Sequence, residues 1–161
     1  MKPHPKTLLA PVLALGLLAA SLGAGAQQAQ QPKPEQLIKW RQSAYQVLGW
    51  NTARIRANVE GTYNKEEVIR AANTIAAIAN SGMGSLYAPG TETGKGWHDT
   101  TVKPALFTDG KKAGEAAAAF NKEANELARV ALSGDVAAVK AQAAAVQRSC
   151  KGCHDDFRNA N

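Results

Sequence analysis

The chain has 161 residues, 45% of them hydrophobic, with 19 basic and 13 acidic residues and a formal net charge of +6. This length is enough for one domain with one sizeable hydrophobic core. The basic residues are scattered and form no stripe with interleaved aromatic residues, which argues against a nucleic-acid-binding protein.

The first 26 residues have the pattern of a secretory signal peptide. A basic start is followed by an apolar run over residues 7–20 and by small residues, with a predicted cleavage site before Gln27. The alternative, an uncleaved membrane anchor, is disfavoured because the run is short for a span of roughly 20 residues and contains Pro11 and Gly16. We therefore expect residues 1–26 to be removed, and we expect no membrane span in the rest of the chain.

The remaining chain is predicted to consist of a mobile polar tail at residues 27–32 and one domain over residues 33–161. Pro34 suits the first turn of a helix, where its missing N–H group would be unpaired anyway. Apolar residues at a spacing of three to four predict that this first helix continues to about residue 58.

Asn64 is a good N-cap for a second helix, predicted from residue 65 to about residue 80. Glycine and proline residues then interrupt residues 82–101. An irregular connection of this length is uncommon and tends to be functional. A short helical turn is predicted after it, at residues 103–107.

Two more apolar stripes predict a third helix, which starts after Thr108 or Asp109 and runs to about residue 132, and a fourth helix capped by Asp135. Strands are not predicted, because there is little period-two alternation and alanine, a strong helix former, is abundant. The sequence therefore predicts an all-α fold, an antiparallel four-helix bundle with one long crossing loop.

Near the end of the fourth helix lies Cys150-Lys151-Gly152-Cys153-His154, the attachment signature of a c-type haem. Each thiol adds to one haem vinyl group and forms a thioether bond, while the adjacent imidazole coordinates the iron. Both cysteines of the chain are used in this way. We therefore predict one covalently attached haem c, held by Cys150 and Cys153, with His154 as an axial iron ligand.

Three other uses of this motif are a redox-active dithiol, a zinc half-site and a structural disulfide. A thioredoxin-type dithiol lies in an alternating strand–helix pattern, which this sequence lacks. A structural zinc site usually needs four ligands, and no second Cys/His cluster occurs. Haem attachment takes place outside the bacterial cytoplasm, so the motif and the signal peptide together predict a periplasmic protein.

The sixth iron ligand decides what such a haem does. A methionine or a second histidine makes a closed, low-spin electron carrier, whereas no ligand leaves the iron open to a small gas. Besides His154, residues 27–161 offer Met83 and His98, and both lie in the long loop rather than on a core-facing helix position. The inventory therefore favours a five-coordinate, high-spin haem.

Several stretches carry a likeness to a known family, and they span nearly all of residues 27–161. They are Lys33-Pro34-Glu35, Trp40-Arg41-Gln42-Ser43-Ala44, Ala88-Pro89-Gly90-Thr91, Lys103-Pro104 and the residues from Cys150 to Arg158. Together they resemble the cytochrome c′ family, bacterial four-helix proteins whose haem motif lies close to the C-terminus. This combination is far more specific than the haem motif alone.

The resemblance implies that His154 is the sole axial protein ligand and that Tyr45, on the first helix, caps the opposite, distal face of the iron. Low-spin relatives have methionine near this position, and many family members have leucine. A tyrosine agrees with an open site, because a neutral phenol with a pKa near 10 is a poor iron ligand. The alternative for Tyr45 is ordinary packing between helices.

The resemblance also implies contacts from other side chains. Arg41 and Gln42 match positions that contact the haem edge and its propionates, and a guanidinium can pair with a carboxylate through two hydrogen bonds. Thr101 matches a polar haem contact, and Arg158 matches an arginine beside the axial imidazole. The alternatives are a solvated Arg41 and an Arg158 that only interacts with the helix dipole.

The function we expect is a periplasmic haem protein that binds nitric oxide, and carbon monoxide more weakly, at an open distal face and transfers single electrons. The alternative is a six-coordinate electron carrier without a gas-binding role. We do not expect an enzyme such as a peroxidase, because no distal histidine lies on a helix. The resemblance further implies a homodimer through the first two helices, for which Trp50 and Tyr63 are candidates if they are exposed.

Overall fold

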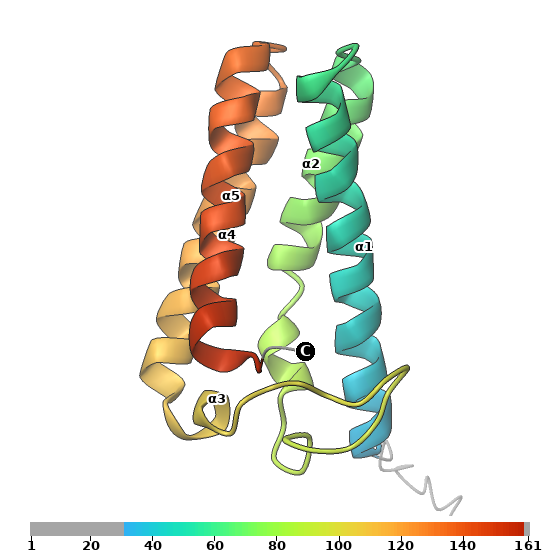
Figure 1. Ribbon diagram of the computed structural model, residues 1–161, viewed down its shortest axis with the longest axis vertical. Coiled ribbons are helices and arrows are strands. Elements are labelled where there is room, and N and C mark those ends of the chain that lie inside the picture. The colour runs from blue at the N-terminus through green and yellow to red at the C-terminus, as the bar shows by residue number, and fades with distance from the viewer. Residues whose placement is uncertain (1–30, 160–161) are drawn as a thin grey trace, which may run out of the picture. The chain divides into compact units, whose positions relative to one another are not determined.

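The computed structural model describes residues 31–159, so the predicted signal peptide and most of the predicted tail lie outside the described residues. The described part is all-α and contains only two isolated β-bridges, Lys95 with Asp99 and Val102 with Arg158. None of its helices combines the length and the apolarity needed to span a bilayer. In chain order the helices are α1 (Pro34–Glu60), α2 (Lys65–Ala79), the 3₁₀ helix η1 (Met83–Leu86), α3 (Ala105–Thr108), α4 (Gly110–Ala131) and α5 (Val136–Phe157) (Figure 1).

Side-chain caps fix where three of the long helices begin. The Asn64 side chain accepts from the N–H of Glu67 at 3.1 Å and starts α2. Asp109 rather than Thr108 caps α4, and Asp135 accepts from the first amides of α5. Each cap satisfies N–H groups that have no partner inside the helix. The four long helices that the sequence predicts are thus confirmed, with ends within about two residues of those expected.

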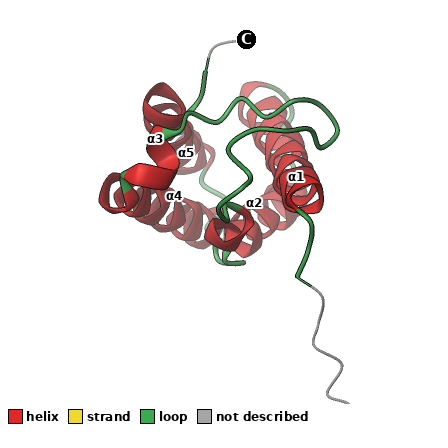
Figure 2. Cartoon of the chain, turned by 90° about the horizontal axis from the view of Figure 1, so that it is seen from below, coloured by secondary structure: helices red, strands yellow, loops and turns green. Residues whose placement is uncertain are grey.

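The long helices form a closed ring in which α1 packs against α2, α2 against α4, α4 against α5, and α5 against α1. Figure 2, which looks along the helices, shows this ring. Its core is built from apolar side chains with almost no exposed surface. Each of the larger ones contributes about 1.5–3 kcal/mol relative to exposure. The largest of these side chains are Ile38, Ile55, Val68, Ile75, Leu127, Val139 and Val146.

The connection between α2 and α4 crosses the end of the bundle where α1 begins and α5 ends (Figure 1). Two backbone hydrogen bonds hold it against the end of α5. The N–H of Lys103 donates to the Phe157 carbonyl at 2.8 Å, and the N–H of Asn159 donates to the Thr101 carbonyl at 2.8 Å. The long loop therefore lies beside the haem motif that α5 carries.

Candidate haem site

The last turns of α5 present two thiols and an imidazole. Cys150 and Cys153 are free and half-buried, and Cys150 packs against the hydrophobic core. Their spacing of three residues, with His154 four residues after Cys150, keeps these groups within little more than one helical turn. Burial raises the pKa of both thiols, so they are protonated at neutral pH.

His154 is held as a neutral imidazole. Partial desolvation lowers its pKa, and the nearby positive charge of Arg158 lowers it further. Arg158 follows directly after α5, and its backbone N–H donates to the His154 carbonyl at 3.0 Å. A neutral imidazole is the form that coordinates a metal. Two free thiols and a neutral imidazole in one turn fit a haem c, which supplies an iron that binds a gas or changes its charge by one electron.

Tyr45 reaches this region from α1. Although 43% of the residue is exposed, its hydroxyl oxygen lies 2.8 Å from the hydroxyl oxygen of Tyr87. Desolvation raises the pKa of Tyr45 above its ordinary value of 10.0, with further contributions from Tyr87 and from Cys153 on α5. The phenol is therefore neutral at physiological pH and lies within electrostatic reach of the haem-attachment motif.

Arg41 is buried, with 3% of its surface exposed, and binds the long loop. Its Nη1 donates to the Leu86 carbonyl at 3.3 Å and to the Thr91 hydroxyl at 2.9 Å. Its Nη2 donates to the Thr91 carbonyl and to the Thr100 hydroxyl, both at 2.7 Å. These contacts use the four terminal N–H groups of the guanidinium, so the Nε–H group is the donor that is left for a haem propionate.

Gln42 also binds the loop. Its side-chain oxygen accepts from the N–H of Trp97 at 2.7 Å, and its Nε2 donates to the His98 carbonyl at 2.9 Å. Thr101 is half-buried, and its carbonyl is bonded to Asn159. The haem contacts expected of Arg41, Gln42 and Thr101 remain predictions. In the structure, Arg41 and Gln42 also hold the long loop through hydrogen bonds.

Sequence reasoning missed the residues that face Arg41 and Tyr45. Tyr87, Thr91 and Thr100 lie 42 to 59 residues further along the chain than their partners. No spacing rule connects positions so far apart. The stretch from Ala88 to Thr91 carries a family likeness, but that likeness implies no contact with Arg41.

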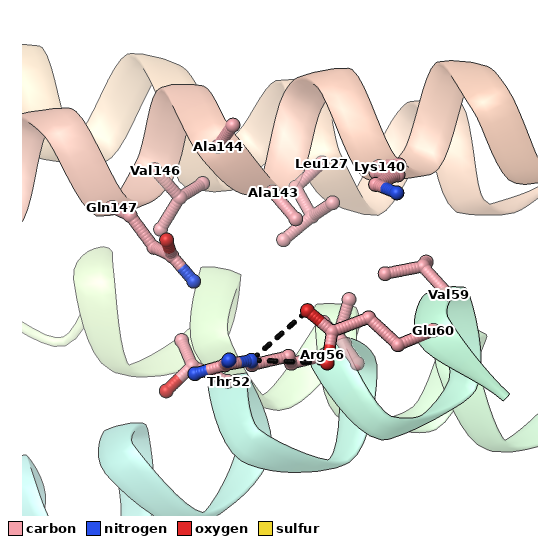
Figure 3. Close-up of a pocket in the computed structure, with 11 residues that line it drawn as sticks. Thr52, Arg56, Val59, Glu60, Leu127, Lys140, Ala143, Ala144, Val146 and Gln147 are labelled. Atoms are coloured by element: carbon pink, nitrogen blue, oxygen red, sulfur yellow. Dashed lines mark hydrogen bonds and ion pairs between the residues drawn. The ribbon is translucent and has the colours of Figure 1, made fainter.

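A cavity of about 310 Å³ lies between α1 and α5, next to the predicted site rather than in it (Figure 3). Arg56 and Glu60 form an ion pair at 3.1 Å on its α1 side. The other side chains that line it are Thr52, Ile55, Val59, Leu127, Lys140, Ala143, Ala144, Val146 and Gln147. None of the predicted haem residues is among them, so this cavity does not define the haem site.

A family model described as Cytochrome C′ matches residues 36–158. The chain belongs to the cytochrome c′ family. It is 72% identical over 127 residues to a cytochrome c′ of Rhodocyclus tenuis, covering 78% of this chain and 96% of the relative. It is 45% identical over 158 residues to a cytochrome c′ of Allochromatium vinosum, covering 98% and 99% of the two chains.

Solved structures agree with this assignment. A cytochrome c′ described as having an unusual ligand-controlled dimer dissociation is 46% identical, with a TM-score of 0.78 over 80% of this chain and 98% of that one. A nitric oxide complex of a mutant cytochrome c′ from Alcaligenes xylosoxidans is 25% identical, with a TM-score of 0.72 over 80% and 98%. The four-helix bundle and the covalent haem c predicted from the sequence are confirmed by this family membership.

Proposed function

We propose that this member of the cytochrome c′ family holds a five-coordinate, high-spin haem iron, with His154 as its one protein ligand. It binds nitric oxide and carbon monoxide on the opposite face and also transfers single electrons. The observation that carries the proposal is the neutral phenol of Tyr45 on α1, which is hydrogen-bonded to Tyr87. Low-spin relatives have methionine near this position, and we propose that Tyr45 stands here in place of that sixth ligand. A protonated phenol is a poor ligand, so it fills the space without occupying the coordination position.

Nitric oxide binding is supported by the likeness to the Alcaligenes xylosoxidans protein, a mutant of which has been solved as a nitric oxide complex. In this chain, the residue that an incoming gas must displace is Tyr45. A small diatomic can pass a side chain that moves by rotation about χ1, whereas a larger ligand needs the helices to separate. Steric selection by Tyr45 is therefore the mechanism we propose for the preference for small gases.

We also propose a binding and electron-transfer role rather than an enzymatic one. A peroxidase needs a distal group that takes up and returns a proton near neutral pH. The raised pKa of Tyr45 makes its phenol unsuited to this task. The proposed location is the periplasm, which is supported by the signal pattern of residues 1–26 and by the haem-attachment motif.

A homodimer through α1 and α2 belongs to the same proposal. Trp40, Val47 and Trp50 are 48%, 39% and 62% exposed and lie on one side of α1. A family relative is described as dissociating from a dimer under ligand control. Tyr63, the other candidate, packs partly buried against the core, and its hydroxyl is buried. The interface that we propose therefore uses Trp50 and not Tyr63.

The absorption spectrum of the reduced protein tests the proposal. We expect a broad five-coordinate Soret band that shifts when carbon monoxide is added. A sharp low-spin spectrum that carbon monoxide does not change would show instead a six-coordinate electron carrier. Replacing Tyr45 with alanine should accelerate carbon monoxide binding, as measured by stopped-flow absorbance, because the pocket is then open. An unchanged association rate would show that Tyr45 is not the gate.

A further inference from the structure

The phenol of Tyr45 is tied to a second phenol on the long loop. Tyr87 directly follows η1, and its hydroxyl oxygen lies 2.8 Å from that of Tyr45. This distance is typical of a good O–H···O hydrogen bond. The bond connects α1 to a segment 42 residues away, so Tyr45 is fixed at both ends, by its backbone on α1 and by its hydroxyl on the loop.

Tyr87 is itself held in place. The Arg41 guanidinium lies over its ring, with the central carbon 4.6 Å from the ring centroid. The same guanidinium donates to the Leu86 carbonyl, directly before Tyr87, and to both oxygens of Thr91. The ring of Phe107 lies 6.3 Å from that of Tyr87, centroid to centroid, in a tilted arrangement. Tyr87 is therefore held by contacts that do not involve Tyr45.

We propose that Tyr87 is a positioning residue for the distal gate: its hydroxyl holds the Tyr45 phenol in the closed position, and a gas that enters must break this hydrogen bond. The inference rests on the proposed function, because it requires Tyr45 to stand in the path of the ligand. The barrier to gas entry then has two contributions. One is steric and comes from the size of Tyr45, and the other is the hydrogen bond to Tyr87 on the loop.

The electrostatics of the pair agree with this geometry. Desolvation is the main cause of the raised pKa of both phenols. Tyr87 raises the pKa of Tyr45 further, whereas the charge of Arg41, which lies over the Tyr87 ring, lowers the pKa of each phenol. Both hydroxyls are therefore protonated at neutral pH, and each oxygen is able to donate or to accept. The hydrogen bond persists over the whole physiological pH range.

The test compares three single variants of the haem-loaded protein: Tyr87→Phe, Tyr45→Ala and Tyr63→Phe. Tyr87→Phe keeps the ring under Arg41 and removes only the hydroxyl. Tyr63→Phe is the matched control, since its buried hydroxyl has no hydrogen-bond partner among the described residues. Carbon monoxide association is measured by stopped-flow absorbance. Tyrosine ionisation in the absence of gas is followed by ultraviolet difference absorbance as the pH is raised.

We expect carbon monoxide to bind Tyr87→Phe about two- to tenfold faster than it binds the wild-type protein. This is the range that the loss of one neutral hydrogen bond allows. Dissociation should not change, because Tyr45 has already left Tyr87 in the bound state. Tyr45 should also ionise at a lower pH in this variant, and Tyr63→Phe should bind at the original rate.

Other outcomes separate the two proposals. An unchanged rate in Tyr87→Phe together with a faster rate in Tyr45→Ala would overturn the role of Tyr87 and leave Tyr45 as the gate. Unchanged rates in both variants would overturn the gate itself, and with it the part of the proposed function on which the inference rests. An equal acceleration in Tyr63→Phe would show that the effect is not specific to the hydrogen-bonded pair.

Discussion

Arg41 shows how a buried cation is accommodated without a buried carboxylate. The acceptors around it are neutral carbonyl and hydroxyl oxygens, and the ring of Tyr87 adds a cation–π contact. Desolvation lowers the pKa of Arg41, and the neighbouring tyrosines and Glu92 oppose this shift. Arginine is suited to the position because its planar fork points several donors in fixed directions and it keeps its charge when buried.

We expect Arg41→Lys to destabilise the protein by about 2–4 kcal/mol. An ammonium group cannot bond at the same time to all the loop oxygens that the guanidinium binds, so some buried oxygens are left unpaired. Urea unfolding followed by circular dichroism measures the change. Arg56→Lys is the control, since Arg56 is exposed and, among residues 31–159, forms an ion pair with Glu60 alone. This variant should alter stability by less than about 0.5 kcal/mol. Equal losses of stability in the two variants would contradict this role of Arg41 in holding the loop.

The contrast between Arg41 and the haem motif explains which site residues are predictable. Cys150, Cys153 and His154 are adjacent in sequence, and their chemistry depends on spacing within one helical turn, so a local pattern identifies them. Family likeness predicts a haem contact for Arg41. Its contacts with Thr91 and Thr100 depend on how a loop folds back over α1, which no local pattern records.

The loop between α2 and α4 approaches α1 closely at one point. A Cβ added to Gly96 would lie 2.5 Å from Oε1 of Gln42 and 2.8 Å from the backbone nitrogen of Lys39. Glycine is therefore required here for close approach of two backbones. This contact lets Gln42 bond to Trp97 and His98.

We expect Gly96→Ala to lower the free energy of unfolding by about 1–3 kcal/mol, because the added methyl group pushes the loop away from α1. Gly84→Ala in the same loop is the control, since its added Cβ would meet no atom within 4 Å. Thermal unfolding measures stability, and limited proteolysis of residues 80–104 should be faster only in the Gly96 variant. Identical behaviour of the two variants would show that the loop adapts without cost.

Glu67, near the junction of α1 and α2, is expected to make a contribution to stability that is lost in acid. The Asn58 side chain, followed by the Arg54 guanidinium at 3.1 Å, lowers the pKa of Glu67 below its ordinary value of 4.5. The folded state therefore binds the proton less tightly than the unfolded state. The stabilisation is present above that ordinary value and is lost as the pH falls through the folded pKa.

As the pH is lowered from about 5 to about 3, we expect the free energy of unfolding of Glu67→Gln to fall less steeply than that of the wild-type protein. Urea unfolding at each pH measures this difference. Glu66→Gln is the control, because Glu66 lies in the same turn of α2 and forms no ion pair among the described residues. Parallel pH profiles for all three proteins would exclude this contribution of Glu67.

The four long helices were predictable because their signals are local: apolar residues at a spacing of three to four, and caps at Asn64, Asp109 and Asp135. The ring follows from these signals, since four amphipathic helices joined by two short turns bury their apolar faces only against one another. The path of residues 80–109 was not predictable, because it depends on tertiary contacts such as those of Arg41 and Gly96 with partners far away in sequence.

The exposed side of α1 leads to a prediction about association. The ring buries its apolar residues inward, yet Trp40, Val47 and Trp50 remain outside it on one helix. Large apolar side chains that are exposed on one side of a helix are typical of a protein–protein interface. A second copy of the chain is the partner we propose, because a family relative forms a dimer. Replacing Val47 by glutamate would place an unpaired charge at the centre of the interface, which is strongly unfavourable.

We therefore expect Val47→Glu to weaken the dimer at least about tenfold, which corresponds to about 1.4 kcal/mol. Sedimentation velocity of the haem-loaded protein over a range of concentrations measures this change. Val136→Glu is a closely matched control, because Val136 is also 39% exposed but belongs to α5 rather than to α1 or α2. It should leave the dimer unchanged, and a glutamate there is compatible with the helix N-terminus. Equal weakening by both variants would indicate a general effect of added charge, while a dimer that survives Val47→Glu would place the interface elsewhere.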